Sequence, residues 1–269
     1  MIAKNENSIN LNKYISNTGI CSRREAEKLI VDGKVTINGN PTKLGNRVFE
    51  GDIVKINGQP LKSTPKTLYL AFNKPVGIVC TTDSKERRNI VKYINHPERL
   101  FPIGRLDKPS EGLIFLTNDG DIVNKILRAG NKHEKEYIVT VNKPITQSFL
   151  DKMAEGIPIL GTITKKCRVF QINEFSFKII LTQGLNRQIR RMCEYLNYEV
   201  SQLIRTRIMN INLGSLKIGE WREISAKEMA NIYEMVKNSS KTEEASKDHS
   251  KKKFNAGRKK IIQKRNRKN

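Results

Sequence analysis

The stretch FPIGRLDKPSEGLIFLTNDG, residues 101–120, is the most informative part of this 269-residue chain about its fold. Its first half is a loop bounded by glycine and proline, in which Asp107 stands between Arg105 and Lys108. Positive charge on both sides favours the ionised carboxylate and attracts a phosphate backbone. The apolar run 113–116 then predicts a strand that ends at an Asn-Asp-Gly turn. The aspartate of an isolated Arg-Leu-Asp more commonly forms a surface salt bridge. The sequence around Asp107 is therefore needed to distinguish a functional carboxylate from such a salt bridge.

The chain around this stretch, from 67 to 237, alternates short strands with helices. A capping box at Ser225 opens the last of these helices. The strands and helices follow no regular βαβ rhythm, which favours an α+β domain over a doubly wound sheet. Strand patterns occur at 68–72, 137–141 and 175–181, and helical patterns at 122–127, 146–154 and 187–196.

A smaller zone, residues 1–58, precedes this domain and combines two short helical patterns with strands. The second helix starts with a capping box at Ser22. The strand pattern at 35–37 leads into Asn38-Gly39, the strongest short signal for a hairpin. We therefore predict a separate small module, joined to the larger domain by a polar linker at 59–66.

The chain is strongly basic, with 50 Lys and Arg against 27 Asp and Glu and a net charge of +23. Phosphate contacts by such residues supply most non-specific affinity for nucleic acids, which makes RNA or DNA the first partner to consider. The segment 238–269 holds 12 basic and 3 acidic residues and almost no apolar ones, so we predict a disordered tail. This tail would extend the reach for RNA or only add solubility.

Other classes of function receive no support from the sequence. Four cysteines and three histidines are scattered without metal-ligand spacing, so we expect neither a zinc site nor disulfides. We find no Walker motif and no glycine-rich dinucleotide motif after a strand, and we expect no cofactor. Without an apolar run of membrane-spanning length or a secretory h-region, we expect a cytoplasmic protein that contacts no membrane.

The first zone resembles the S4 RNA-binding module over the stretch from Asn10 to Gly58. In such modules a helix pair and the turn after it form a basic surface that docks on RNA. The resemblance implies RNA contacts for Arg23, Arg24 and Lys28, which project from the second helix away from its apolar face. The alternative is an ordinary solvated helix face.

Three segments of the larger domain, GRLD at 104–107, HEKEY at 133–137 and NRQIRRM at 186–192, resemble the motifs of the pseudouridine synthase family. The resemblance implies a catalytic domain with a mixed, largely antiparallel sheet and flanking helices. It also implies three catalytic residues, namely Asp107 as the catalytic carboxylate, Tyr137 against the target base, and Arg190 as a bidentate partner of Asp107.

Further residues beside these motifs are expected to contact substrate RNA. Leu181 matches an apolar residue of the base pocket, and Arg187 would bind a phosphate. Arg187, Arg190 and Arg191 share a helical spacing, whose ordinary explanation is a solvated basic face. The predicted substrate-contacting set of this domain is Arg105, Leu106, Lys108, Leu181, Arg187, Gln188 and Ile189.

The S4-like module combined with these motifs resembles the branch of the family that modifies ribosomal RNA. Segments such as GIPILGTITKKC and QGLNRQIRRMCEYLNYEV are similar to members that act on uridine 2604 of 23S rRNA. The resemblance therefore implies 23S rRNA as the partner, with a side activity on tRNA seen in some members. We expect a monomer that closes around RNA.

The implied reaction detaches uracil from ribose C1′ and rejoins it through C5. Asp107 would act as a nucleophile at C1′ or remove a proton from C2′, and Tyr137 or Asp107 would take the C5 proton. One rival is an assembly factor that only binds RNA, which predicts an altered aspartate. Another is a metal-dependent RNA hydrolase, which would require clustered Asp, Glu or His ligands.

Overall fold

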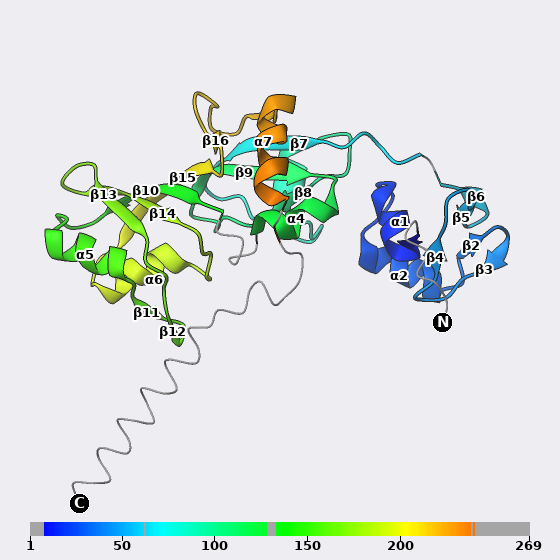
Figure 1. Ribbon diagram of the computed structural model, residues 1–269, viewed down its shortest axis with the longest axis horizontal. Helices are drawn as coiled ribbons and strands as arrows, with labels where there is room; N and C mark the ends of the chain where they lie inside the picture. Colours follow the sequence, from blue (N-terminus) through cyan, green and yellow to red (C-terminus); the bar gives the residue numbers. More distant parts are fainter. Residues whose placement is uncertain (1–7, 62, 128–132, 238, 240–269) are drawn as a thin grey trace, which may run out of the picture. The chain divides into compact units, whose positions relative to one another are not determined.

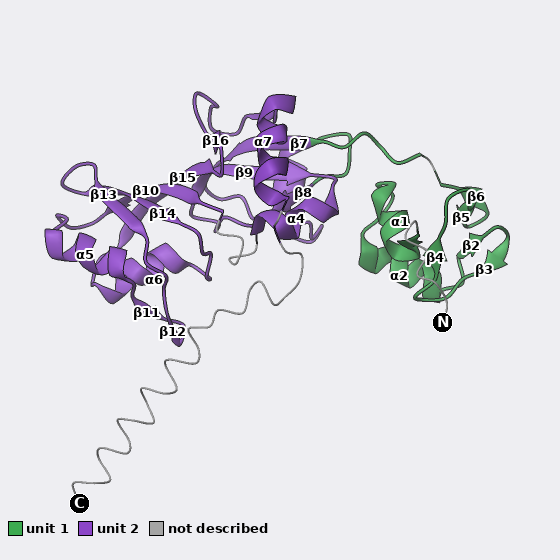
Figure 2. Cartoon of the chain, viewed as in Figure 1, with its two compact units in different colours: residues 1–68, 96–100 green, residues 69–95, 101–269 purple. Residues whose placement is uncertain are grey.

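A computed structural model of the chain describes residues 8–61, 63–127, 133–237 and 239. The chain forms two compact units, which Figure 2 colours separately. Unit 1 runs to Leu68 and includes His96–Leu100, and unit 2 comprises Tyr69–Asn95 and the chain from Phe101 onward. The predicted tail at 238–269 lies outside the described residues, apart from Ser239.

Unit 1 packs two helices against short antiparallel strands. Ser22 caps the second helix, and its capping box with Glu25 is confirmed. The buried side chains Leu11, Ile15 and Ala26 belong to the core of this unit. Its elements are α1 (Leu11–Asn17), α2 (Arg23–Val31), β1 (Ile9–Asn10), β2 (Val35–Ile37), β3 (Asn40–Pro41), β4 (Arg47–Val48), β5 (Val54–Ile56) and β6 (Gln59–Pro60).

Two boundaries differ from the sequence-based expectation. Gln59 and Pro60 form β6 and pair with β5, so the predicted linker starts too early at residue 59. A proline fits an edge strand because its missing N–H can face away from the partner strand. His96–Leu100, predicted in the larger domain, belongs instead to unit 1, in which Arg99 interacts electrostatically with Glu25.

Unit 2 is built on a nine-stranded mixed sheet with the order β13-β14-β10-β15-β9-β7-β17, to which β8 and β16 add at β9 and β15 (Figure 1). Every pairing is antiparallel except that of β9 with β15, which confirms the predicted mixed, largely antiparallel sheet. The strands are β7 (Tyr69–Lys74), β8 (Phe101–Ile103), β9 (Glu111–Thr117), β10 (Lys135–Val141), β13 (Arg168–Gln171), β14 (Ser176–Leu181), β15 (Val200–Ile208), β16 (Ile211–Asn212) and β17 (Trp221–Glu223).

Helices flank this sheet, as predicted. Ile122 of α4 and Ile232 of α7 share one apolar cluster with Phe115 of β9. Phe149 of α5 packs on Phe177 of β14, with ring centroids 5.3 Å apart. The helices of unit 2 are α3 (Ile90–Ile94), α4 (Gly120–Leu127), α5 (Gln147–Glu155), α6 (Gln188–Tyr195) and α7 (Ala226–Val236), and a hairpin joins β11 (Pro158–Ile159) to β12 (Thr162–Ile163).

The parallel junction of β9 and β15 depends on a glycine. Gly112 pairs with Arg205 and has a φ of +103°, a backbone conformation that residues with a side chain rarely adopt. A Cβ atom at Gly112 would lie 2.4 Å from the carbonyl oxygen of Arg205 and 2.7 Å from its amide nitrogen. Only a residue without a side chain therefore permits this approach of the two strands.

We predict that Gly112→Ala destabilises unit 2 by about 3 kcal/mol or more, because backbone strain adds to a clash with backbone atoms. Thermal unfolding followed by circular dichroism measures the loss. Gly120→Ala is the matched control, since Gly120 begins α4 without a positive φ and its Cβ would approach nothing closer than 4.0 Å. Equal melting temperatures for the two variants would contradict the packing described here.

Candidate active site

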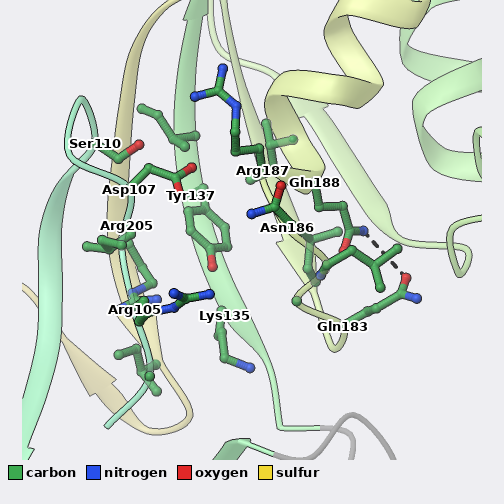
Figure 3. A pocket seen from close by; sticks show the side chains of 18 of the residues that line it. Arg105, Asp107, Ser110, Lys135, Tyr137, Gln183, Asn186, Arg187, Gln188 and Arg205 are labelled. Carbon is green, nitrogen blue, oxygen red and sulfur yellow. Dashed lines mark hydrogen bonds between the residues drawn. The ribbon is translucent and has the colours of Figure 1, made fainter. Parts of the chain in front are cut away.

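A cavity of about 340 Å³ opens in unit 2, between the sheet and two loops (Figure 3). Residues of β10, β14 and β15 form its floor. The loop 104–110, which connects β8 to β9, lines one side, and the segment 183–188 before α6 lines another. Residues far apart in the sequence thus meet around a single space.

The floor of the cavity follows from the alternation of side chains along paired strands. Lys135 and Tyr137 are two residues apart on β10, so both project to the same face of the sheet. Leu181 of β14 pairs with Lys135, and Arg205 of β15 pairs with Tyr137. All four side chains are buried and line the cavity.

The loop that carries Asp107 is fixed by backbone hydrogen bonds at Asp107 and at the residue after it. The carbonyl of Asp107 accepts a hydrogen bond from the amide of Ser110 at 3.0 Å. The carbonyl of Lys108 accepts one from the amide of Gly77 at 2.8 Å. Asp107 itself is half-buried and lines the cavity beside the buried Leu106.

Arg190 of α6 is buried and binds the chain that follows Asp107. Its guanidinium donates hydrogen bonds to the carbonyl of Pro109 at 3.0 Å, to the hydroxyl of Ser110 at 3.3 Å and to the carbonyl of Val200 at 3.0 Å. These bonds differ from the predicted bidentate pair with Asp107. Burial lowers the pKa of Arg190, and the nearby charge of Asp107 opposes that effect. Arg190 therefore interacts with Asp107 electrostatically and holds its loop.

The ordinary explanation for the spacing of Arg187, Arg190 and Arg191, a solvated basic face, does not hold, because Arg190 is buried whereas Arg187 is exposed. Arg187 precedes α6 as its N-cap residue, with a left-handed φ of +49°. Gln188, the first helical residue, is buried and accepts a hydrogen bond from the amide of Leu185 at 3.0 Å. Regular spacing places arginines along a helix but does not tell which one packs inward.

Of the substrate-contacting residues predicted in unit 2, all but one line the cavity. Lys108 is exposed and does not line the cavity. In unit 1, Arg23, Arg24 and Lys28 are exposed on α2, whose buried side is formed by Ala26 and Ile30. The predicted residues that line the cavity are Arg105, Leu106, Asp107, Tyr137, Leu181, Arg187, Gln188, Ile189 and Arg190.

Sequence reasoning missed two buried cations of the cavity, Lys135 and Arg205. Burial, followed by the charge of Arg205, lowers the pKa of Lys135 to about 8. Arg205 donates a hydrogen bond from Nε to the carbonyl of Leu113 at 2.6 Å. The alternation of HEKEY would have placed Lys135 beside Tyr137, whereas nothing in the spacing of RTRIMNI marks Arg205 as buried.

The described ranges contain no group of three His, Cys, Asp or Glu side chains that could hold a metal ion. Among the helices in those ranges, none is long and apolar enough to cross a membrane. The arrangement around Asp107 is therefore a carboxylate next to aromatic, apolar and cationic side chains. Such a set can hold a planar base and supply one carboxylate to its sugar.

Comparison with known proteins assigns both units. The RNA pseudouridylate synthase family matches residues 68–195, and the S4 domain matches residues 9–54. The dual-specificity RNA pseudouridine synthase RluF of Escherichia coli K12 is 56% identical over 237 residues, which cover 87% of this chain and 82% of that protein. The chain belongs to the RNA pseudouridine synthase family.

Other relatives of this pseudouridine synthase support the same assignment. The ribosomal large subunit pseudouridine synthase B of Bacillus subtilis is 32% identical over 231 residues, covering 82% of this chain and 94% of that protein. A crystal structure of a pseudouridylate synthase is 29% identical, with a TM-score of 0.62, and the match covers 83% of this chain and 99% of that one. The synthase is thus similar in both sequence and fold to enzymes of this class.

The buried Lys135 makes the stability of the synthase depend on pH. Its pKa is about 8 in the folded protein and 10.5 when unperturbed, so the unfolded chain binds the proton more tightly. Stability should therefore rise as pH increases from about 8 towards 10.5, by up to about 3 kcal/mol from this residue. Urea unfolding at several pH values measures this increment as the difference between the wild type and Lys135→Met. A difference that does not change with pH would contradict the burial of a charged Lys135.

Proposed function

We propose that this synthase converts uridine 2604 of 23S rRNA to pseudouridine with Asp107 as its catalytic carboxylate. The observation that carries the proposal is the position of Asp107 at a base-sized cavity whose floor is formed by Tyr137 and Leu181. A base in folded RNA must leave its stack before an enzyme can reach its glycosidic bond. A cavity of about 340 Å³ provides the space for such an extruded base.

Tyr137 and Leu181 receive the base in this proposal. Both side chains are buried and project from neighbouring strands to the same side of the sheet. An aromatic ring stacks on any base, and an apolar side chain excludes water from the opposite surface. The hydroxyl end of Tyr137 points away from Asp107 in Figure 3.

Asp107 then acts at the ribose. As a nucleophile it would form a bond to C1′ while the C1′–N1 bond breaks. As a base it would remove the C2′ proton, and the C1′–N1 bond would break as a glycal forms. When C5 of the uracil bonds to C1′, the bond from C1′ to Asp107 breaks, or the glycal takes back the proton at C2′. Tyr137 or Asp107 then removes the C5 proton, and N1 gains a proton. Arg190 positions the Asp107 loop throughout by holding Pro109 and Ser110.

RNA binding is assigned to basic side chains of both units. The exposed Arg23, Arg24 and Lys28 of the S4 domain would contact phosphates, as would Arg187 at the start of α6. Such contacts give affinity without reading sequence. The cavity is formed by unit 2 of a single chain, which supports a monomeric enzyme. A ribosomal RNA substrate would place that enzyme in the cytoplasm.

The relatives support the choice of RNA. The Bacillus subtilis relative is named for the large ribosomal subunit, and the Escherichia coli relative is named for dual specificity. We therefore propose tRNA as a second substrate beside 23S rRNA. The basic charge of the chain, +23 in total, fits either RNA.

We predict that Asp107→Asn abolishes pseudouridine formation on a 23S rRNA fragment and leaves its Kd within about threefold, because the amide keeps the shape of the side chain and loses the negative charge that makes the carboxylate a nucleophile or base. Pseudouridine-specific chemical labelling and a filter-binding assay measure the two quantities. Asp151→Asn, an identical change on the exposed surface of α5, should leave both unchanged. Pseudouridine formation by Asp107→Asn at the wild-type rate would remove Asp107 from the mechanism.

The target is tested by a pseudouridine map of rRNA and tRNA from cells with and without the gene. We predict that deletion removes the modification at position 2604 of 23S rRNA, and that the wild-type gene restores it whereas Asp107→Ala does not. An unchanged signal at that position, with loss at another, would refute the proposed target and identify the actual one.

A further inference from the structure

Two cations lie buried side by side on the floor of the cavity. Lys135 on β10 is 8% exposed and Arg205 on β15 is 4% exposed. Tyr137, which should receive the base, lies two residues from Lys135 and pairs directly with Arg205. The two charges interact, since Arg205 contributes to the lowered pKa of Lys135. The fold thus brings two like charges together at the place that the base should enter.

These cations have few partners among the residues that the structure describes. Lys135 donates to the carbonyl of His133 at 3.5 Å, the limit of a hydrogen bond. Arg205 uses Nε on the carbonyl of Leu113, while its buried Nη2 has no hydrogen-bond partner in the described part of the chain. Burying a charge without a counter-charge is unfavourable, so a group that arrives later is the expected partner.

The nearby carboxylates of β10 and its flank are already engaged by other arginines. Glu134 forms ion pairs with Arg168 at 2.6 Å and with Arg207 at 3.0 Å. Glu136 projects to the other face of β10 and lies 3.6 Å from Arg207. Asp107 is the acidic residue among the described residues that line the cavity, and it is needed at the ribose.

The proposed reaction supplies the missing negative charge. When the C1′–N1 bond breaks, its electron pair stays on the uracil, and C1′ gains a bond to an oxygen of Asp107 or a double bond to C2′ after loss of a proton. The detached base is then an anion whose charge is shared by N1, O2 and O4. Preorganised cations in a water-poor site stabilise such developing charge strongly.

We propose that Lys135 and Arg205 hold the detached uracil as an anion while it turns from N1 to C5. This assignment rests on the proposed function and names the groups that keep the free base in the cavity. An ammonium group has no fixed direction, so Lys135 can follow the base as it rotates. The planar guanidinium of Arg205 is held by Leu113 and lines the same cavity, where its fixed charge attracts the anion.

The proposal requires Lys135 to be protonated, which predicts a fall of the rate as pH rises through about 8. A lysine acting as a general base would give the opposite trend. The other charged and titratable groups at the cavity are Arg205 from β15, Tyr137 on the same strand, Arg187 and Arg190 near α6, and Arg105 and Asp107 from the loop. β14 and α4 contribute Leu181, Ile126 and Leu127, which do not titrate. His133 has a pKa lowered by burial, so its titration lies at lower pH.

The test is the single-turnover rate of pseudouridine formation on a 23S rRNA fragment, with the enzyme in saturating excess. We expect Lys135→Met to slow the rate by about 100-fold or more with an unchanged RNA Kd. Lys135→Arg, which stays charged, should retain most of the wild-type rate. Its rate should not decrease as pH rises above 8. Lys178→Met is the matched control, because Lys178 lies on the other face of β14, outside the cavity lining, and should behave as the wild type.

A rate for Lys135→Met within about threefold of the wild type would overturn the proposal, as would a rate of the wild type that rises through pH 8. Arg205→Met should also slow the reaction, and its melting temperature shows whether the loss of the bond to Leu113 has unfolded the domain. A wild-type enzyme that forms no pseudouridine on this fragment or on tRNA would instead refute the proposed function. That outcome differs from an unchanged rate of Lys135→Met and from a wild-type rate that rises with pH.

Discussion

The close contact between Gly112 and the backbone of Arg205 is the constraint on which the rest of unit 2 depends. It allows β9 to run parallel to β15 within an otherwise antiparallel sheet, and so joins the β7–β9 half of the sheet to the β10–β14 half. β9 begins directly after the loop of Asp107, while β15 carries Arg205 on the cavity floor. One missing side chain therefore brings Asp107 and the floor of the cavity together.

Within this geometry, the main electrostatic feature of the site is a group of cations around one carboxylate. The cations near Asp107 make different contacts. Arg190 binds the backbone of the Asp107 loop, whereas Lys135 and Arg205 line the cavity. Burying several cations lowers the free energy of unfolding, as is common at functional sites. The arrangement suits a reaction in which a neutral base becomes an anion for a short time and then forms a new bond. The S4 domain contributes a basic helix surface of its own, formed by Arg23, Arg24 and Lys28.

Short-range sequence patterns predicted many elements of this structure. The features that they did not predict depend on packing between residues distant in sequence. The capping boxes at Ser22 and Ser225 and the Asn38-Gly39 hairpin lie where the sequence placed them, because they depend on neighbours a few residues away. The motif resemblance likewise assigned Asp107 and Tyr137 to one site, and both line one cavity. The burial of Arg190 and Arg205 and the pairing of β6 depend on partners distant in sequence, which no spacing rule specifies. Lys135 is different, because its alternation with Tyr137 in HEKEY places both side chains on one face of the strand.

The central claim is that an extruded uracil lies on Tyr137, with its ribose at Asp107 and its carbonyl oxygens towards Lys135 and Arg205. A crystal structure of Asp107→Asn bound to an RNA hairpin that contains the target uridine tests it most directly. The account predicts electron density for the base inside the cavity, C1′ within reach of residue 107, and Arg190 still bound to Pro109 and Ser110. A target uridine that remains stacked in the RNA, or a base bound outside this cavity, would contradict it.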